Sequence, residues 1–118
     1  MIIFDTDLGL GTPNCEIDDG AALIQLLGLF PEQVAAVTTV HGNGTIDAVV
    51  QNSCRLLSYL MRTDIPLGVG AACGLIEQKE WFTEWQAAYG PTPAWPIPAN
   101  LPASANLIVD LVLSLIHI

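Results

Sequence analysis

The strongest constraint on the fold is an acidic loop within residues 2–19, between a short apolar run and an apolar-periodic stretch. The run Ile2–Phe4 predicts a buried strand, and the stretch Ala21–Phe30 has the spacing of an amphipathic helix. The Gly/Pro/Asn-rich segment that joins them carries acids at both of its ends: Asp5, Asp7, Asp18 and Asp19. The order is therefore strand, acidic loop, helix.

If this loop folds back, the four carboxylates converge where the strand ends and the helix begins. Like charges at short range raise one another's pKa and repel, so such a cluster needs a compensating cation. A ligand set made only of oxygen atoms favours a hard ion, Ca²⁺ or Mg²⁺.

A purely structural interpretation is also open. Asp18 has the residue type of a helix N-cap, and Asp19 in the first turn suits the helix dipole. Taken one at a time, these acids are ordinary loop and cap residues; their number and placement favour a site.

The pattern that follows predicts an α/β fold. We expect helices at about 19–30 and 45–61, and strands at 33–40 and 65–69. Apolar strands alternating with helices indicate an open, mostly parallel sheet with helices on both faces. The turn 41–44 and the acidic loop then leave from the carboxyl ends of neighbouring strands, the edge where such sheets bind ligands.

The chain after Gly70 is less regular. We expect a helix at about 77–89, an irregular proline-rich segment at 90–98 that is either a lid or a connector, and a last helix that Ser104 caps and that runs through Val112.

Composition excludes several classes of function. The formal charge of −9 includes only three basic residues, which argues against nucleic-acid or anionic-membrane partners. No basic n-region or small-residue cleavage site is visible, so we expect a cytoplasmic protein. The mean hydropathy of +0.51 is high for a self-contained domain of 118 residues and indicates part of a larger sheet. The three cysteines lack C-x-x-C spacing and are interpreted as reduced thiols.

Other motif interpretations of Asp5-Thr6-Asp7 fit less well. An EF-hand needs glycine where Leu10 stands, and a dinucleotide-binding loop needs a third glycine where Asn14 stands. Among these alternatives, the one that fits the motif best is a haloacid-dehalogenase-type, Mg²⁺-dependent phosphatase with Asp5 as nucleophile. A fragment that merely binds a divalent ion or ribose is the non-enzymatic alternative.

The motifs together resemble the inosine–uridine-preferring nucleoside hydrolases. Residues 2–9 followed by 18–21 look like the Asp-rich N-terminal signature of that family, and 38–43 (Thr-Thr-Val-His-Gly-Asn) resembles its second motif. Residues 62–71 are similar to its third strand and 104–112 to a later helix. The resemblance implies a truncated Rossmann-like nucleoside hydrolase fold. It also implies hydrolysis of ribonucleosides, small-molecule substrates, to ribose and free base.

The resemblance also implies site roles, position by position. Asp7 resembles a Ca²⁺ ligand that is also the general base, and Asp19 a second Ca²⁺ ligand. Asp18 resembles the acid that binds the ribose hydroxyls, and Asn43 a further ribose contact. Asp5 looks like a supporting residue that orients the loop. For the full-length parent protein, the resemblance is compatible with a homo-oligomer.

Several features depart from the family pattern. Residues 10–17 form an insert that we expect to bulge away from the site, and His41 is expected to be buried and hydrogen-bonded or to touch the base. Family members are much longer, so we expect residues 1–112 to be the N-terminal part of the domain, without a complete site. Residues 113–118 match the translation of a common transposon library adaptor, and we expect them to be a non-native tail.

Overall fold

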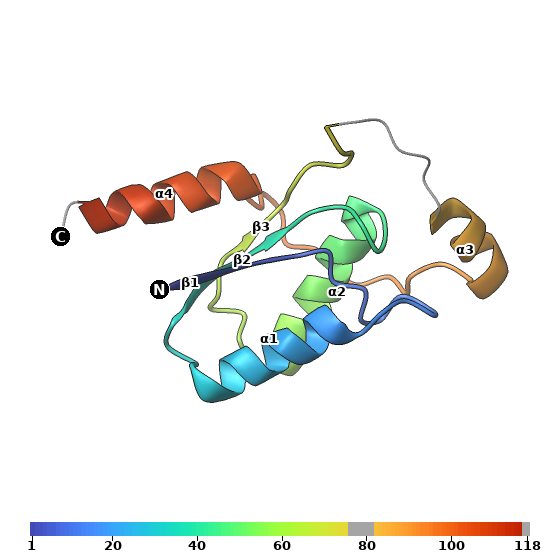
Figure 1. Cartoon of the computed structure of the whole chain (residues 1–118), viewed down its shortest axis with the longest axis horizontal. Helices are drawn as coiled ribbons and strands as arrows, with labels where there is room; N and C mark the ends of the chain where they lie inside the picture. Colours follow the sequence, from blue (N-terminus) through green and yellow to red (C-terminus); the bar gives the residue numbers. More distant parts are fainter. Residues whose placement is uncertain (76–81, 117–118) are drawn as a thin grey trace.

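The computed structural model describes residues 1–75 and 82–116 and has the predicted α/β architecture (Figure 1). The elements in chain order are β1 (Ile2–Thr6), α1 (Asp18–Leu29), β2 (Val34–Thr39), α2 (Ile46–Tyr59), β3 (Leu67–Gly68), α3 (Phe82–Tyr89) and α4 (Ser104–Ile116). The three strands form a parallel sheet in the order β1-β2-β3. The open parallel sheet expected from the sequence is thereby confirmed.

Helices cover both faces of this sheet. On one face, the paired residues Phe4 and Val37 pack with side chains of α1 and α2. The core on that side contains Leu8, Leu23, Leu27, Val34, Val37, Val49, Val50, Leu56, Leu57, Ile65 and Leu67. Successive strand residues face opposite sides. Gly68, one rung beyond Val37, therefore faces the other side, where a Cβ would meet Ser104 and Leu107 of α4.

The start of α1 differs from the N-cap interpretation of Asp18. Ile17 is the residue at the cap, and no side chain provides a capping hydrogen bond there. Asp18 and Asp19 lie inside the first helical turn, where a negative charge is favoured by the helix dipole. The helix thus leaves both carboxylates available for other contacts.

The ends of α2 follow local chemistry. Thr45 is the N-cap, and its side chain accepts a hydrogen bond from the Ala48 N–H at 3.2 Å. The apolar periodicity predicts a helix through Met61, but the helix ends at Tyr59 because Met61 has a left-handed φ of 55°. The Arg62 N–H donates to the Leu57 carbonyl oxygen at 2.8 Å, which closes a Schellman-type end.

Ser104 has a different role from the expected cap. It is the first residue of α4 and is buried, and its Oγ exchanges two hydrogen bonds of 3.3 Å with the backbone N–H and carbonyl of Thr39. This contact attaches α4 to β2. The helix continues without a break to Ile116, past the expected end at Val112. The adaptor origin of residues 113–118 stays a prediction.

The proline-rich segment is irregular, as expected, and lies against α2. The Trp95 N–H donates to the Gln51 side chain at 3.0 Å, and the rings of Trp95 and Tyr59 meet edge to face at 5.4 Å. Of the helix expected at 77–89, residues 77–81 lie outside the described residues, and α3 forms the rest.

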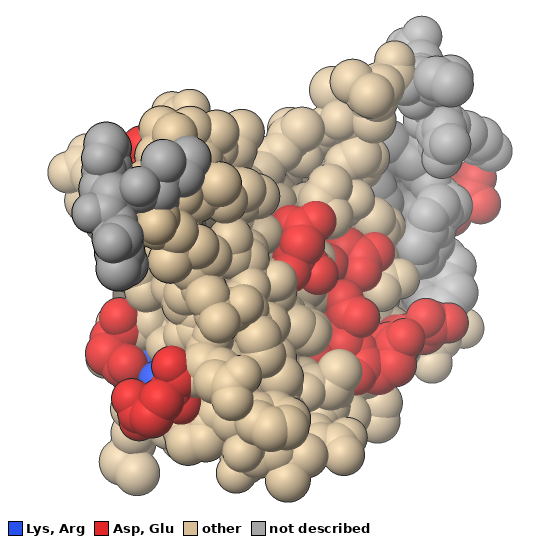
Figure 2. All heavy atoms as spheres, turned by 60° about the vertical axis from the view of Figure 1, so that its left-hand side comes forward, with Lys and Arg blue, Asp and Glu red and all other residues tan. Residues whose placement is uncertain are grey.

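The surface of the described residues is strongly acidic. Figure 2 shows acidic side chains gathered in a patch on one face of the molecule. The basic side-chain atoms visible in this view lie away from that patch, beside a second group of acidic side chains. Within 1–75 and 82–116, none of the helices is long and apolar enough to cross a bilayer.

Candidate active site

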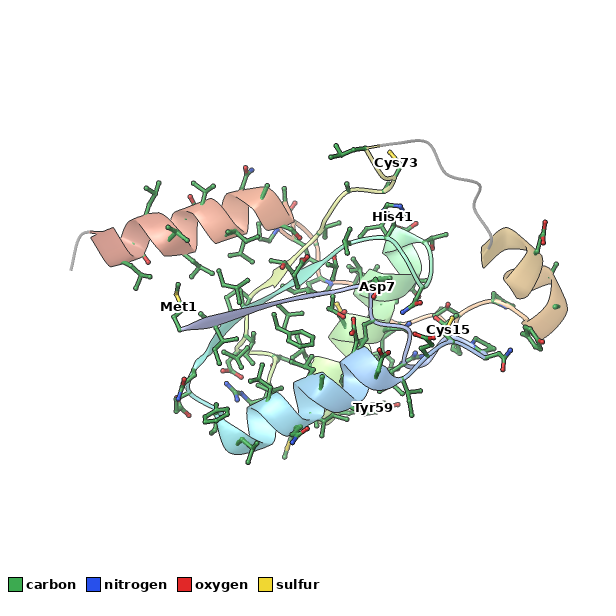
Figure 3. All side chains as sticks on the ribbon, in the orientation of Figure 1. Met1, Asp7, Cys15, His41, Tyr59 and Cys73 are labelled. Atoms are coloured by element: carbon green, nitrogen blue, oxygen red, sulfur yellow. The ribbon has the colours of Figure 1, made fainter. Side chains whose placement is uncertain are left out.

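The acidic loop and the turn after β2 meet at the carboxyl edge of the sheet, as predicted. Thr6 and Thr39, the last residues of their strands, are paired, and the Val40 N–H donates to the Thr6 carbonyl oxygen at 3.0 Å. Figure 3 shows Asp7 and His41 on the neighbouring loops that leave these strand ends. Parallel pairing therefore brings the two motifs together.

Asp7 is held against the turn by a backbone contact. Its Oδ2 accepts a hydrogen bond from the Asn43 N–H at 3.0 Å. The close approach depends on Gly42, because a Cβ at that position would overlap the Asp7 carboxylate. A glycine is thus required where the turn passes over this side chain.

Asp7 and Asp19 form a repulsive pair of carboxylates. The pKa of Asp7 is raised above its usual value, first by burial and then by the negative charge of Asp19, although the Asn43 N–H acts in the opposite direction. Asp19 is in turn held by Thr6, whose Oγ1 donates to Asp19 Oδ2 at 2.5 Å. The end of β1 and the first turn of α1 therefore place two carboxylates side by side.

The other two predicted acids lie apart from this pair. Asp18 is exposed on the first turn of α1. Asp5 is exposed on the face of the sheet opposite Thr6, and its Oδ1 accepts from Thr38 Oγ1 at 2.6 Å. Within the described residues, no three His, Cys, Asp or Glu side chains form a group that could hold a metal. The structure therefore brings together two of the four carboxylates.

Asn43 contributes its backbone to the site. Its N–H binds Asp7, and its carbonyl oxygen accepts from Cys15 Sγ at 3.2 Å. The neighbouring His41 is half-buried, and its Nδ1 has no hydrogen-bond partner among the described residues. The unpaired Nδ1 differs from the first of our two expectations, a buried hydrogen-bonded histidine, and the second, a contact with the nucleobase, stays a prediction.

The insert 10–17 packs onto the site instead of bulging away from it. Leu10 lies against Gly20 at the start of α1, Cys15 bonds to the turn after β2, and Thr12 Oγ1 accepts from the Asn52 amide of α2 at 2.9 Å. The expectation was wrong because Leu10 packs against α1, while the polar side chains of the insert bond to α2 and to the turn after β2. Thr6, Cys15 and Asn52 were not predicted from the sequence; a polar residue inside the apolar stripe of α2 was the available signal for Asn52.

A cavity of about 380 Å³ lies elsewhere, between α2, the start of β3 and the segment 95–102. Trp95, Pro96 and Leu57 contribute to its apolar lining. Among the described residues that line it, none belongs to the predicted site, so the cavity is separate from the Asp7–Asp19 pair.

Comparison with known proteins assigns the family. The sequence matches the family model described as inosine-uridine preferring nucleoside hydrolase over residues 2–114. The chain belongs to this family. The match covers both motifs at the carboxyl edge and favours a nucleoside hydrolase over the phosphatase alternative.

Curated relatives are named as pyrimidine-specific ribonucleoside hydrolases. RihA of Shewanella sp. (strain MR-7) is 34% identical over 108 residues, which are 91% of this chain and 32% of the relative. RihA of Salmonella schwarzengrund (strain CVM19633) is 32% identical over the same coverage. RihA of Escherichia coli O139:H28 (strain E24377A / ETEC) is 32% identical over 77% of this chain. The nucleoside hydrolase chain described here thus spans about a third of the length of these relatives.

The donor set at the carboxyl edge fits part of a hard-cation site. The family is one of metal-dependent hydrolases. Asp7 and Asp19 offer carboxylate oxygens, and the mutual repulsion that helps to raise the pKa of Asp7 is relieved by a bound cation. Hard cations such as Ca²⁺ take six to eight oxygen ligands, so two carboxylates supply a portion of the shell.

Proposed function

We propose that the full-length parent of this chain hydrolyses the N-glycosidic bond of ribonucleosides, releasing ribose and the free base. The observation that supports this most directly is the Asp7–Asp19 pair at the carboxyl edge of a chain that belongs to the nucleoside hydrolase family. The relatives' names make pyrimidine ribonucleosides the substrates to test first.

Asp7 and Asp19 are the proposed ligands of a Ca²⁺ ion, which when bound would orient the attacking water and the ribose diol and lower the pKa of that water. Asp7 is also the proposed general base. Its carboxylate accepts the proton that the water loses as the water oxygen attacks the anomeric carbon. The N-glycosidic bond breaks, and its electron pair goes to the nitrogen of the nucleobase.

The surrounding acids stabilise the reaction in a second way. Positive charge develops on the ribose as the glycosidic bond breaks, and nearby carboxylates stabilise such an oxocarbenium-like transition state. Asp18 and Asn43 are the proposed ribose contacts, and Asp5 is a supporting residue. We expect the 118-residue chain by itself to be inactive, because two carboxylates do not complete the metal site. A homo-oligomeric parent and a cytoplasmic location stay predictions.

The test uses the full-length parent with uridine, cytidine, inosine and p-nitrophenyl phosphate, and measures ribose release against phosphate release. Asp7→Asn should lower turnover by about 10²–10⁴-fold and weaken calcium binding, because it removes the proton acceptor and one charge. Asp18→Asn should raise KM while calcium affinity stays near that of the wild type.

Asp47→Asn is the matched control, since Asp47 is also an exposed acid in the first turn of a helix. It should leave turnover and KM unchanged. Phosphate release without ribose release, or wild-type turnover in Asp7→Asn, contradicts the proposal.

A further inference from the structure

Asn52 is a polar side chain buried in the middle of α2, with 1% of its surface exposed. Its Nδ2 donates to the Leu8 carbonyl oxygen at 3.1 Å and to Thr12 Oγ1 at 2.9 Å. Leu8 directly follows Asp7 and is itself fully buried. Both amide hydrogens of Asn52 are therefore used to hold the first residues of the loop after β1.

Arg55 fixes the other end of the Asn52 amide. Its Nη2 donates to Asn52 Oδ1 at 2.5 Å, and its Nη1 donates to the Pro93 carbonyl oxygen at 3.4 Å. The guanidinium lies against Gly11, whose φ of +109° and lack of a Cβ allow the approach. The network thus extends from α2 to the proline-rich segment.

A direct contact joins the two segments that Asn52 and Arg55 hold. Thr12 Oγ1 and Thr92 Oγ1 share a hydrogen bond of 2.8 Å. The loop after β1, helix α2 and residues 92–93 are consequently connected by a chain of hydrogen bonds made by side chains. Of the neutral side chains of this size, only an amide offers two donors and an acceptor, so aspartate or leucine at position 52 would leave buried partners unpaired.

We propose that Asn52 is a positioning residue for Asp7. By holding the Leu8 carbonyl and Thr12, it keeps the loop in the arrangement in which Asp7 accepts the Asn43 N–H and lies beside Asp19. Arg55 connects this positioning to the segment 92–93. The consequence for catalysis rests on the proposed function, whereas the positioning itself does not.

The test is site-resolved amide hydrogen exchange on the 118-residue chain. The reporting amides are those of Asn43, which binds Asp7, and Thr12, which donates to the Gly9 carbonyl oxygen at 2.9 Å. The Arg62 amide, at the far end of α2, is the reference. In Asn52→Ala, exchange at the two reporting amides should accelerate about tenfold relative to the reference, as expected for lost buried hydrogen bonds.

Ser53→Ala is the matched control. Ser53 is the next residue of α2, is fully buried, and its Oγ has no hydrogen-bond partner in the described part of the chain. This variant disturbs the same helix without touching the network, so the reporting and reference amides should change together.

Two milder variants keep the proposal testable if Asn52→Ala fails to fold. Thr12→Val removes the half-buried hydroxyl that accepts from the Asn52 amide, and should accelerate exchange at Asn43 in the same direction, by a smaller factor. Arg55→Met should accelerate exchange at the Trp95 amide, which donates to the Gln51 side chain, more than at the Asn43 amide.

Equal acceleration at all amides in Asn52→Ala, or unchanged exchange at Asn43 in Thr12→Val, overturns the proposal. Because no substrate is involved, this outcome is distinct from a failure of nucleoside hydrolysis.

Discussion

The Thr6 hydroxyl donates to Asp19 Oδ2 at 2.5 Å and so joins the last residue of β1 to the first turn of α1. Thr6 is 3% exposed, and the bond spans the whole acidic loop. The residue that directly precedes Asp7 thereby fixes the second carboxylate of the pair.

Thr6→Val should test this contact. Valine keeps the β-branched shape that suits a strand, but it leaves Asp19 without its hydroxyl donor. We expect the free energy of unfolding to fall by about 1.5–3 kcal/mol, the range for a hydrogen bond to a charged group. Chemical denaturation measures this, and a stability equal to that of the wild type would refute the role given to Thr6.

Gly42→Ala should displace Asp7. A methyl group at position 42 would overlap the Asp7 carboxylate, so either the turn or the carboxylate must move and the hydrogen bond from Asn43 is lost. We expect weaker calcium binding in the full-length parent, measured by calorimetry. Gly28→Ala is the control, because a Cβ at position 28 meets nothing within 4 Å; equal affinities in both variants would contradict the prediction.

Asp7→Asn should stabilise the metal-free chain. The ionised Asp7 carboxylate is partly buried and is repelled by Asp19, which raises the pKa of Asp7, so at neutral pH its charge lowers the free energy of unfolding. An asparagine amide can still accept from Asn43 and can donate to Asp19. The melting temperature at pH 7 should therefore rise, and this gain should disappear as pH falls and Asp7 in the wild type becomes protonated.

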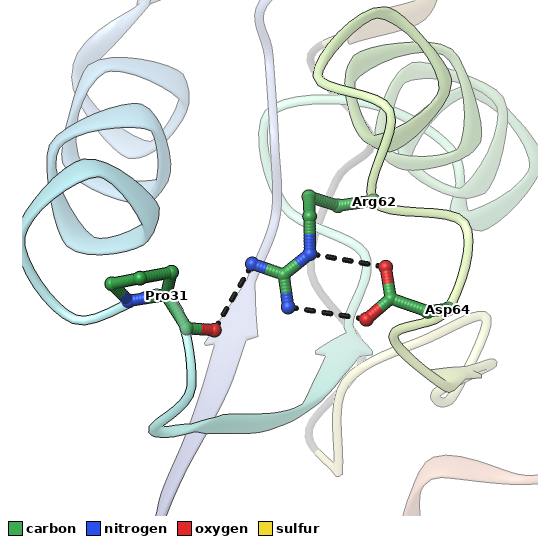
Figure 4. A network of polar contacts seen from close by, with 3 residues as sticks. All are labelled: Pro31, Arg62 and Asp64. Carbon is green, nitrogen blue, oxygen red and sulfur yellow. Dashed lines mark hydrogen bonds and ion pairs between the residues drawn. The ribbon is translucent and has the colours of Figure 1, made fainter.

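The Arg62–Asp64 pair should make stability depend on pH in the opposite direction. Figure 4 shows Arg62 bonded to both carboxylate oxygens of Asp64, at 3.0 and 3.1 Å, and to the Pro31 carbonyl oxygen. The Arg62 side chain holds the pKa of Asp64 below its usual 3.8. The stabilisation is thus present above pH 3.8 and is lost as pH falls through the lowered pKa.

The comparison that isolates this effect is wild type against Asp64→Asn. The difference in free energy of unfolding between them should be constant near neutral pH and shrink in acid. Asp110→Asn, at an exposed acid of α4, is the control. A difference that grows as pH falls would be inconsistent with the pair.

The sequence predicted the sheet and its carboxyl edge because these depend on local periodicity and on the parallel connections between strands. The contacts within the site depend on where β1 ends. Asp5 and Asp7 have the same parity, so an extended strand would place both on one face. The strand stops at Thr6, and Asp7 turns toward Asn43 while Asp5 stays on the face of Thr38. That endpoint is set by tertiary contacts, which periodicity does not encode.

The role of Asp5 separates a nucleoside hydrolase from a phosphatase. Asp5 accepts from Thr38 Oγ1 on the face opposite Thr6, so Asp5→Asn keeps an acceptor for that hydroxyl and leaves the Asp7–Asp19 pair in place. We expect the full-length parent to retain most of its ribohydrolase turnover. A phosphatase with Asp5 as nucleophile would instead lose all activity in this variant.

Asp5→Ala distinguishes a supporting role from no role. It removes the acceptor of Thr38, which is fully buried, and should lower the free energy of unfolding by about 1–3 kcal/mol. Thr38→Val in the same background removes the unpaired hydroxyl and should recover part of this loss. If Asp5→Asn abolishes ribose release while Asp7→Asn preserves it, the assignment of the two acids is reversed, because the reacting carboxylate then lies on the other face of the sheet.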